Sequence, residues 1–383
     1  MQIVDYRITR MQFARDRRIG DSQISTAQVQ IAALELLGSS QAAGLGFVQS
    51  LIYSLPAEAE IDRIFREEAW PGLAGQEAGA VVNRVVRTRG GNTRRMSLPF
   101  EEAIQLACWD LHAKSLGLPL WRLLGGNGAP VPVYASGLDF HLSDGEFTAL
   151  FAKAAALGFT AFKIKVGHPD LDRDIHRLDL LKRTVGGHAT VMIDANEAWS
   201  PRQTIYSLER MRKAGHDILW VEDPTLRNDF AGLKLIRQAI GPTFLNSGEY
   251  LDLQGKRKLL ESEATDMLNV HGQVTDVMRI GWLAAELGVP ITLGNTFLEV
   301  GVNLAIALPG VEWLEYSFQN FEHLVVQPFT LRDGKIWGSN SPGHGLVLSE
   351  TARAAHHCPD ITAAADLPPP PPQIHLGTDP PQA

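Results

Sequence analysis

The sequence predicts an α/β protein in which a closed barrel of parallel strands follows a smaller α+β unit. From residue 131 to residue 316, short apolar runs alternate with stretches of helical spacing. There are eight such runs with seven helical stretches between them, which favours a barrel over an open sheet. The 383 residues have room for a barrel of about 250 residues and a second unit. We therefore predict a (β/α)7β, TIM-like barrel. Its expected strands are VPVYASG, AFKIKVG, TVMIDAN, ILWVEDP, TFLNSGE, DMLNVHG, PITLGN and VEWLEY.

The chain before the barrel has a different pattern. Runs at 3–13 and 25–39 alternate as strands do, and the polar segment RDRRIGDSQ (15–23) between them predicts a turn. GLGF (44–47) predicts a further turn before VQSLIY. Helical spacing and a glycine stop predict a helix within 99–117, and residues 57–70 also have a helical pattern. Together these features indicate a small antiparallel sheet with helices.

The chain after the barrel changes again. FTLRDGKIWG (329–338) predicts a hairpin with Asp333 and Gly334 at its turn. From Leu367 onward, a run of prolines and a polar end predict an extended, disordered tail. The predicted parts are therefore an α+β unit (1–125), the barrel (126–320), a C-terminal return segment (321–366) and the tail (367–383).

Composition excludes several classes of protein. A net charge of −8 argues against a general role in binding nucleic acid or a membrane surface. We find no signal peptide at the N-terminus, and no apolar run approaches the roughly 20 residues of a membrane-spanning helix. Cys108 and Cys358 are the only cysteines, which gives neither a disulfide framework nor a zinc set. We expect a cytoplasmic protein.

Acidic side chains end successive predicted strands. Glu222 follows Asp194 after 28 residues, and Glu249 follows Glu222 after 27, about the length of one βα unit. The carboxyl ends of barrel strands meet on one face, so these carboxylates predict an all-oxygen pocket suited to Mg²⁺. A single acidic strand end is more often a helix N-cap or a surface turn. Matched positions on consecutive strands favour the metal site.

Two lysines lie on the strand before these carboxylates. Lys163 and Lys165 are two residues apart, so both side chains point to the same side of the strand. Inside a barrel, each ammonium and a nearby metal would depress the pKa of the other lysine, and a lysine of near-neutral pKa is a suitable general base. The alternative is an edge strand with a solvated lysine face.

Further polar residues end the other strands. Asn196 shares a face with Asp194, and His271, Asn295 and Glu315 end the last three runs. His271 is a candidate for proton transfer, whereas Asn295 can only form hydrogen bonds. Glu315 could bind substrate or orient a lysine. Abstraction of a proton α to a carboxylate builds an enediolate, which a divalent ion and cationic neighbours stabilise while a base takes the proton.

These motifs resemble the enolase superfamily, in its mandelate racemase and muconate lactonizing branch. The resemblance covers roughly residues 1 to 350 and is specific in combination. The residues that carry it are KIKVG (163–167), MIDAN (192–196), WVEDP (220–224), SGE (247–249), WLE (313–315), ACWDLHAKSLGLPLWRLLGG (107–126) and DGKIWGSNSPGHGLVL (333–348).

The resemblance implies roles for the residues. Asp194, Glu222 and Glu249 would bind Mg²⁺, and Lys165 would act as a base with Lys163 tuning its charge. The N-terminal unit would cap the barrel, and the C-terminal return segment would pack on that cap. The loop at 15–23, with Arg15, Arg17 and Arg18, would lie over the distal end of the substrate, where an arginine could grip a second carboxylate. A solvated loop remains the alternative. A homo-oligomer is implied by the resemblance only.

The departures from the family pattern bear on the reaction. The sixth strand ends in His271, where racemase-type members have an aspartate and epimerase-type members a lysine, and the seventh ends in Asn295 in place of a histidine. A dehydratase needs one base and one acid, so we predict a Mg²⁺-dependent dehydratase of a sugar acid, an aldonate or aldarate. His271 is the candidate acid, and Asn196, Asn295, Glu315, Arg17 and Arg18 are candidate substrate-binding residues. The alternatives are an epimerase, a racemase or a lactone cycloisomerase, and a barrel retained as a non-catalytic protein.

Overall fold

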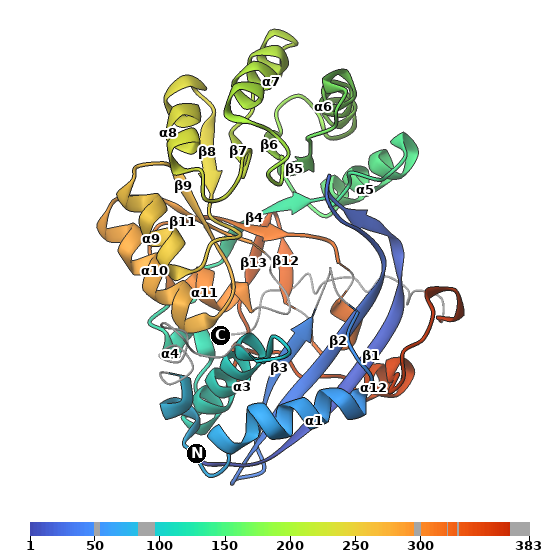
Figure 1. Cartoon of the computed structure of the whole chain (residues 1–383), viewed down its shortest axis with the longest axis vertical. Coiled ribbons are helices and arrows are strands. Elements are labelled where there is room, and N and C mark those ends of the chain that lie inside the picture. Colours follow the sequence, from blue (N-terminus) through green and yellow to red (C-terminus); the bar gives the residue numbers. More distant parts are fainter. Residues whose placement is uncertain (50–53, 83–95, 295–299, 320, 328, 368–383) are drawn as a thin grey trace.

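The computed structural model describes residues 1–49, 54–82, 96–294, 300–319, 321–327 and 329–367. These residues form an N-terminal α+β unit on one side and a barrel on the other, with the chain returning to the first unit after the barrel (Figure 1). The Pro-rich segment 368–383 lies outside the described residues, so the predicted tail remains a prediction, as do the residue boundaries of the four parts.

The barrel is closed by parallel strands. Strand β4 pairs in parallel with β5 on one side and with β11 on the other, so the sheet returns to its start. This closure confirms the predicted (β/α)7β barrel. Its strands are β4 (Val131–Ser136), β5 (Ala161–Lys165), β6 (Thr190–Asp194), β7 (Trp220–Glu222), β8 (Phe244–Ser247), β9 (Met267–Val270), β10 (Ile291–Leu293) and β11 (Val311–Tyr316).

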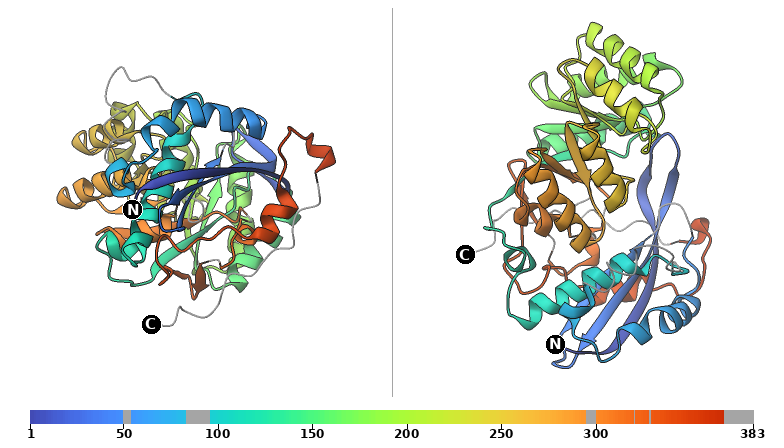
Figure 2. Two further views of the ribbon diagram at one scale, coloured as in Figure 1. Left: turned by 90° about the horizontal axis from the view of Figure 1, so that it is seen from below. Right: turned by 60° about the vertical axis from the view of Figure 1, so that its left-hand side comes forward.

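Helices connect these strands and lie outside them (Figure 2). Local sequence fixes where several begin, because Ser143 and Ser200 each form a capping box that satisfies the first free amides of a helix. The helices are α5 (Asp144–Ala156), α6 (Leu171–Val185), α7 (Pro201–Lys213), α8 (Phe230–Ala239), α9 (Leu253–Glu261), α10 (Val274–Glu286) and α11 (Gly301–Ala307). None of the described helices is long and apolar enough to cross a membrane.

The N-terminal unit is an antiparallel sheet covered by helices. The sheet order is β1 (Ile3–Gly20), β2 (Ser25–Gly38), β3 (Ala43–Gln49). Among the described residues, further elements of this unit and of the link to the barrel are α1 (Glu58–Glu68), η1 (Trp70–Gly72), α3 (Phe100–Ser115) and α4 (Leu120–Leu123).

The prediction of a turn at GLGF was wrong, because residues 44–47 lie inside β3. A Cβ atom on Gly44 would lie 2.0 Å from the Ala107 carbonyl oxygen, and one on Gly46 would lie 2.0 Å from that of Ala103. Both glycines are therefore needed because helix α3 packs directly on the sheet backbone, which only a residue without a side chain permits. The predicted continuation at VQSLIY reaches positions 50–53, which lie outside the described residues.

The prediction of a loop at 15–23 was also wrong in extent. β1 continues to Gly20 and β2 begins at Ser25, with a register shift between Ala14 and Ile19. Only residues 21–24 form the turn, where the Asp21 carboxylate accepts hydrogen bonds from the amides of Gln23 (2.6 Å) and Ile24 (3.0 Å). The arginines that indicated a turn lie on β1, within a long hairpin of β1 and β2. This hairpin reaches from the N-terminal sheet to the barrel (Figure 1).

The chain after β11 returns to the N-terminal unit. As predicted, β12 (Thr330–Arg332) and β13 (Lys335–Trp337) form a hairpin with Asp333 and Gly334 at its turn, and β13 pairs with β4. Helix α12 (Glu350–His356) then packs against β1. Short η2 (Glu322–Leu324) and η3 (Ala364–Asp366) complete the segment.

The junction of the N-terminal unit with the returning chain is built around one buried carboxylate. Asp110 accepts hydrogen bonds from the Lys114 ammonium (2.6 Å), the Leu45 amide (2.9 Å) and the His344 amide (2.8 Å). A Cβ atom on Gly343 would lie 2.1 Å from its Oδ1 atom, so the chain can pass here only as glycine. Asp110 thus links α3, β3 and the C-terminal segment.

Replacing Asp110 by alanine is expected to lower the free energy of unfolding by about 3 kcal/mol, because the substitution leaves the buried Leu45 and His344 amides without their acceptor and removes the ion-pair partner of the partly buried Lys114 ammonium. Denaturant unfolding measures the change. The control is Glu209→Ala, which breaks an exposed pair with Lys213 on α7 and should change the free energy of unfolding by no more than about 0.5 kcal/mol. An equally small change for Asp110→Ala would show that this junction does not hold the units together.

Candidate active site

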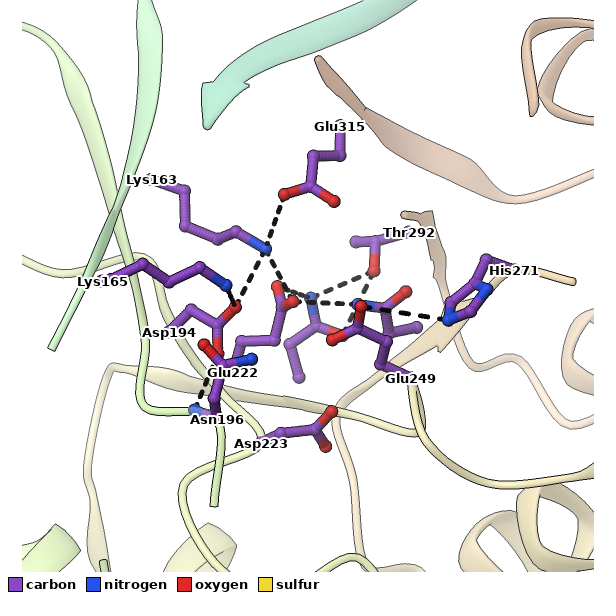
Figure 3. A network of polar contacts seen from close by, with 12 residues as sticks. Lys163, Lys165, Asp194, Asn196, Glu222, Asp223, Glu249, His271, Thr292 and Glu315 are labelled. Atoms are coloured by element: carbon purple, nitrogen blue, oxygen red, sulfur yellow. Dashed lines mark hydrogen bonds and ion pairs between the residues drawn. The ribbon is translucent and has the colours of Figure 1, made fainter. Parts of the chain in front are cut away.

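Strand register places the predicted site residues in one row. Lys165 is the parallel partner of Asp194 on the next strand, and Asp194 is the partner of Glu222 on the strand after that. All three are the last residues of β5, β6 and β7, so they lie at the carboxyl end of the barrel. Glu249 follows β8 by two residues, after Gly248 in the left-handed region at φ 125°. Figure 3 shows these side chains turned toward one another.

Asp194, Glu222 and Glu249 form an acidic triad that could hold a metal ion. One carboxylate oxygen from each lies within 4.8 Å of the others. Burial and the charge of Asp194 raise the pKa of Glu249 to about 7, and burial together with its acidic neighbours raises the pKa of Glu222. Both pKa values are raised because several negative charges lie close together and away from water. A hard divalent cation with oxygen ligands fits this donor set and relieves the crowding.

Two buried lysines face the triad. The Lys165 ammonium lies 2.5 Å from Asp194 Oδ2, and the Lys163 ammonium lies 2.6 Å from Glu222 Oε1 and 3.2 Å from Glu315 Oε1. Both lysines therefore lie inside the barrel, not on a solvated edge strand.

The expected depression of the lysine pKa values is not found in this structure. Burial lowers the pKa of Lys165, and Lys163 lowers it further, but the attraction of Asp194 and other carboxylates outweighs both and raises it. The pKa of Lys163 is raised for the same reason, chiefly through Glu222 and Glu315 against the effect of burial. The prediction considered the two ammonium groups and the metal but omitted the carboxylates that the fold brings beside them. A cation on the triad would oppose this rise.

A second set of polar residues surrounds Glu222, and sequence reasoning missed it. Asn269 donates to Glu222 Oε1 (3.0 Å), and Asn246 donates to Glu222 Oε2 (3.4 Å) and to Thr292 (3.0 Å). These residues are buried on the inner faces of β9, β8 and β10. Their signal in the sequence is a polar residue within an otherwise apolar strand, as in TFLNS, DMLNV and ITL. They orient the carboxylate, as outer hydrogen bonds do at metal sites.

Asp223 was also missed as a site residue. It is buried, and it accepts hydrogen bonds from the Ser247 hydroxyl (2.5 Å) and the Gly248 amide (3.1 Å). Burial and the charge of Glu249 raise its pKa to about 7. Asp223 thereby holds the turn that carries Glu249.

Asn196 lies at the edge of the site. Its amide N–H donates to Asp194 Oδ1 (3.0 Å), and its side chain donates to the Tyr250 hydroxyl (2.6 Å). Gln23, in the hairpin turn of the N-terminal unit, donates to the Asn196 carbonyl. Asn196 therefore connects a metal-ligand candidate, the loop after β8 and the cap.

His271 lies on the opposite side of the triad from the lysines (Figure 3). Its Nε2 atom is 3.9 Å from Glu249 Oε1, and the side chain is 31% exposed, which leaves it accessible to a ligand. Partial withdrawal from water and the nearby charge of Lys256 lower its pKa. Asn295 lies outside the described residues.

The arginines of the hairpin have other contacts. Arg17 donates to the Gly137 carbonyl (3.1 Å) and pairs with Asp16 (3.3 Å), and Arg18 donates to the Ser25 hydroxyl (3.1 Å). Arg15 donates to the backbone carbonyls of Gln28 and Gln319. The structure thus brings together both lysines, the triad, Glu315, Asn196 and His271. The arginines lie on the hairpin, where Arg15 and Arg17 contact backbone carbonyls beyond it.

This fold and site define a known class of enzymes. Residues 146–352, more than half of the chain, match the family model described as enolase C-terminal domain-like. The chain belongs to the enolase superfamily, in the branch of mandelate racemase and muconate lactonizing enzyme, as its motifs indicated.

Solved structures share the whole architecture. A protein of Mesorhizobium loti, provisionally named a mandelate racemase, is 57% identical with a TM-score of 0.93, over 97% of this chain and 99% of its own. L-Talarate/galactarate dehydratase of Salmonella typhimurium, with Mg and L-lyxarohydroxamate bound, is 26% identical with a TM-score of 0.80, over 91% of each chain.

Characterised relatives differ in reaction at similar identity. The chain is 28% identical to the Salmonella typhimurium L-talarate/galactarate dehydratase over 77% of this chain and 70% of the relative. It is also 28% identical to 3,6-anhydro-α-L-galactonate cycloisomerase of Streptomyces coelicolor, over 64% and 68%. An L-Ala-D/L-Glu epimerase of Bacillus subtilis is 27% identical, over 58% and 60%. The comparisons establish an enzyme superfamily and leave the reaction open.

The acidic triad predicts how the protein responds to Mg²⁺. Added Mg²⁺ should raise the melting temperature, because a ligand that binds only the folded state stabilises it. Glu249→Gln is expected to weaken Mg²⁺ binding by at least about 100-fold, since the loss of even an outer hydrogen-bond partner can cost that much. Titration calorimetry measures the affinity. The control is Asp266→Asn. Asp266 precedes β9 and is not part of the triad, and its carboxylate accepts a hydrogen bond from the Leu245 amide. Equal affinity in both variants would contradict the assignment of Glu249.

Proposed function

We propose that this protein is a Mg²⁺-dependent dehydratase of a sugar acid, an aldonate or an aldarate. The observation that carries the proposal is the placement of Lys165 and His271 on opposite sides of the acidic triad (Figure 3). Loss of water from a hydroxy acid needs a base at the α-carbon and an acid at the β-hydroxyl. The two side chains supply one group for each task.

Asp194, Glu222 and Glu249 would hold the metal, as they do in the sequence-based interpretation. When bound, Mg²⁺ supplies the positive charge that stabilises the oxygens of the substrate carboxylate as the α-proton leaves. Two relatives with solved structures contain magnesium, one of them the dehydratase described above. The all-oxygen donor set of this chain suits the same ion.

Lys165 would take the α-proton. Its ammonium lies 2.5 Å from Asp194, so a substrate carboxylate held at the triad brings its α-carbon beside this lysine. The base must be neutral before it acts, and the pKa of Lys165 is raised by the same carboxylates that would bind the metal. Occupation of the triad therefore favours the neutral base, with Lys163 adding repulsion from its own charge.

His271 would give a proton to the departing hydroxyl. It is partly exposed beside Glu249, so the β-carbon of a substrate can reach it from the triad. A lowered pKa makes the charged imidazole a stronger acid and restricts the charged form to lower pH. Asn196, Asn295, Glu315, Arg17 and Arg18 remain proposed substrate contacts. A cytoplasmic location and a homo-oligomer likewise remain predictions from the sequence.

The alternative function is an isomerisation by the same α-proton abstraction. It is favoured by the cycloisomerase and the epimerase, which are 28% and 27% identical to this chain where the dehydratase is 28% identical. Against it stands the end of β9, where this chain has His271 and no lysine partner for Lys165. A non-catalytic barrel is disfavoured, because burial of two lysines and three carboxylates (Asp194, Glu222 and Glu315) destabilises a fold that makes no use of them.

The deciding experiment is ¹H NMR in D₂O of the Mg²⁺-loaded protein with a panel of aldonates, aldarates and their lactones. A product with a new methylene beside a keto acid would establish dehydration and identify the substrate. An epimer, a ring-opened isomer or deuterium uptake without loss of water would establish the isomerase alternative. No reaction across the panel would contradict the proposed substrate class.

Replacing Lys165 by alanine is expected to lower the turnover rate by at least about 100-fold, because general-base catalysis contributes that much. Mg²⁺ should still bind, since the triad keeps its oxygens. Product formation and titration calorimetry provide the two measurements. Full activity in Lys165→Ala would rule out this residue as the base.

Replacing His271 by asparagine is expected to slow loss of the hydroxyl while exchange of the α-proton continues, because the first step depends on Lys165 alone. Deuterium incorporation and keto-acid formation are followed together by NMR. The acid assignment holds if only keto-acid formation falls, and it fails if both rates are unchanged.

A further inference from the structure

The backbone amide of Lys165 has an unusual partner. The pairing between β4 and β5 ends at Ser136 and Lys163, so the amide two residues further along β5 extends past the end of β4. It donates instead to the side-chain Oδ1 atom of Asp139, at 3.1 Å. This carboxylate takes the place of a further backbone carbonyl of β4, at the residue that bears the proposed base.

The loop after β4 is shaped to make this contact. A Cβ atom on Gly137 would lie 2.6 Å from Asp139 Oδ1, so only glycine allows the side chain to fold back over the strand end. Leu138 has a φ of 47°, in the left-handed region that residues other than glycine avoid. An unfavourable backbone conformation is thus accepted at the position that aims Asp139 at β5.

Asp139 itself is in an unfavourable environment. The residue is 1% exposed, and its Oδ2 atom has no hydrogen-bond partner among the described residues. Burial raises the pKa of this carboxyl to about 6, so at neutral pH the group is mostly ionised and accepts the Lys165 amide. A buried carboxylate with one unsatisfied oxygen is a poor choice for stability alone.

The cap holds the same loop from the other side. The Gly20 amide at the tip of the hairpin donates to the Leu138 carbonyl (3.0 Å), and Gly20 forms a parallel bridge with Asp139. The His141 ring nitrogen Nε2 lies 3.0 Å from the Ile24 carbonyl oxygen. The loop 137–141 therefore touches the cap on one face and the strand of the base on the other.

We propose that Asp139 is a positioning residue that fixes the end of β5, and with it the Lys165 side chain, and so couples the seating of the cap hairpin to the position of the base. The inference rests on the proposed role of Lys165. It assigns no contact with substrate or metal to Asp139.

The test compares Asp139→Ala with Asp139→Asn. The alanine variant is expected to exchange the α-proton about 100-fold more slowly, since small misplacements of a reacting group cost that much, with KM and Mg²⁺ affinity unchanged. The asparagine variant keeps an oxygen acceptor for the Lys165 amide and should recover most of the rate. The control is Asp266→Ala, which removes a carboxylate from the Leu245 amide at the start of β8, and which should lower stability without lowering the exchange rate.

Coupling to the cap is tested by a double-mutant cycle with His141→Ala. If both residues act through the same loop, the exchange rate of the double variant falls by less than the product of the fold-losses in the two single variants. Independent effects would overturn the coupling. An unchanged rate in Asp139→Ala, an equally slow Asp139→Asn, or a parallel loss of Mg²⁺ affinity would each overturn the positioning role. Failure of the proposed function is distinct, because the unaltered protein would then form no keto acid from the panel, and failure of the base assignment would appear as α-proton exchange that persists in Lys165→Ala.

Discussion

The charge balance at the carboxyl end of the barrel is the constraint on which the rest of the structure depends. Four carboxylates (Asp194, Glu222, Glu249 and Glu315) meet two ammonium groups (Lys163 and Lys165), all largely withdrawn from water. With all six groups ionised, a net charge of −2 is left over, and one divalent cation would neutralise it. Such a cluster is stable only where each charge has a close partner. The barrel places Lys165 and Asp194 in register on adjacent strands, and Lys163 reaches Glu222 and Glu315 on more distant strands across the barrel interior.

The surrounding structure keeps these charges in place. Asn246 and Asn269 hold Glu222 from inside the barrel, and Asp223 holds the turn that carries Glu249. The cap reaches the same region through its hairpin, by way of Gln23 at Asn196 and Gly20 at the loop of Asp139. Lys165, the proposed base, and Asp194, a metal-ligand candidate, are thus both connected through neighbouring residues to one turn of a different unit. This arrangement explains why a chain segment so distant in sequence belongs to the site.

The reaction is decided outside this common core. Relatives named as a dehydratase, a cycloisomerase and an epimerase match the chain at 27 to 28% identity, so membership of the superfamily does not by itself define the reaction. We propose that the group on the other side of the triad sets the reaction of this chain. In this chain it is His271, beside Glu249 and away from the lysines. The chemistry of that side, and the substrate that fits it, defines the function we propose.

The sequence by itself determined the barrel and the row of charged strand ends. Strand and helix periods are local, and in a closed parallel barrel every strand end must point to the same face, so Lys165, Asp194 and Glu222 could be placed together without coordinates. The extent of the hairpin, the strand at GLGF and the role of Asp139 came only from the tertiary structure. Each depends on a contact between distant segments: the hairpin on the barrel, α3 against Gly44 and Gly46, and a side chain folded back on a neighbouring strand. The lysine pKa values belong with these, because they depend on how many carboxylates the fold gathers around each ammonium, and no local pattern records that number.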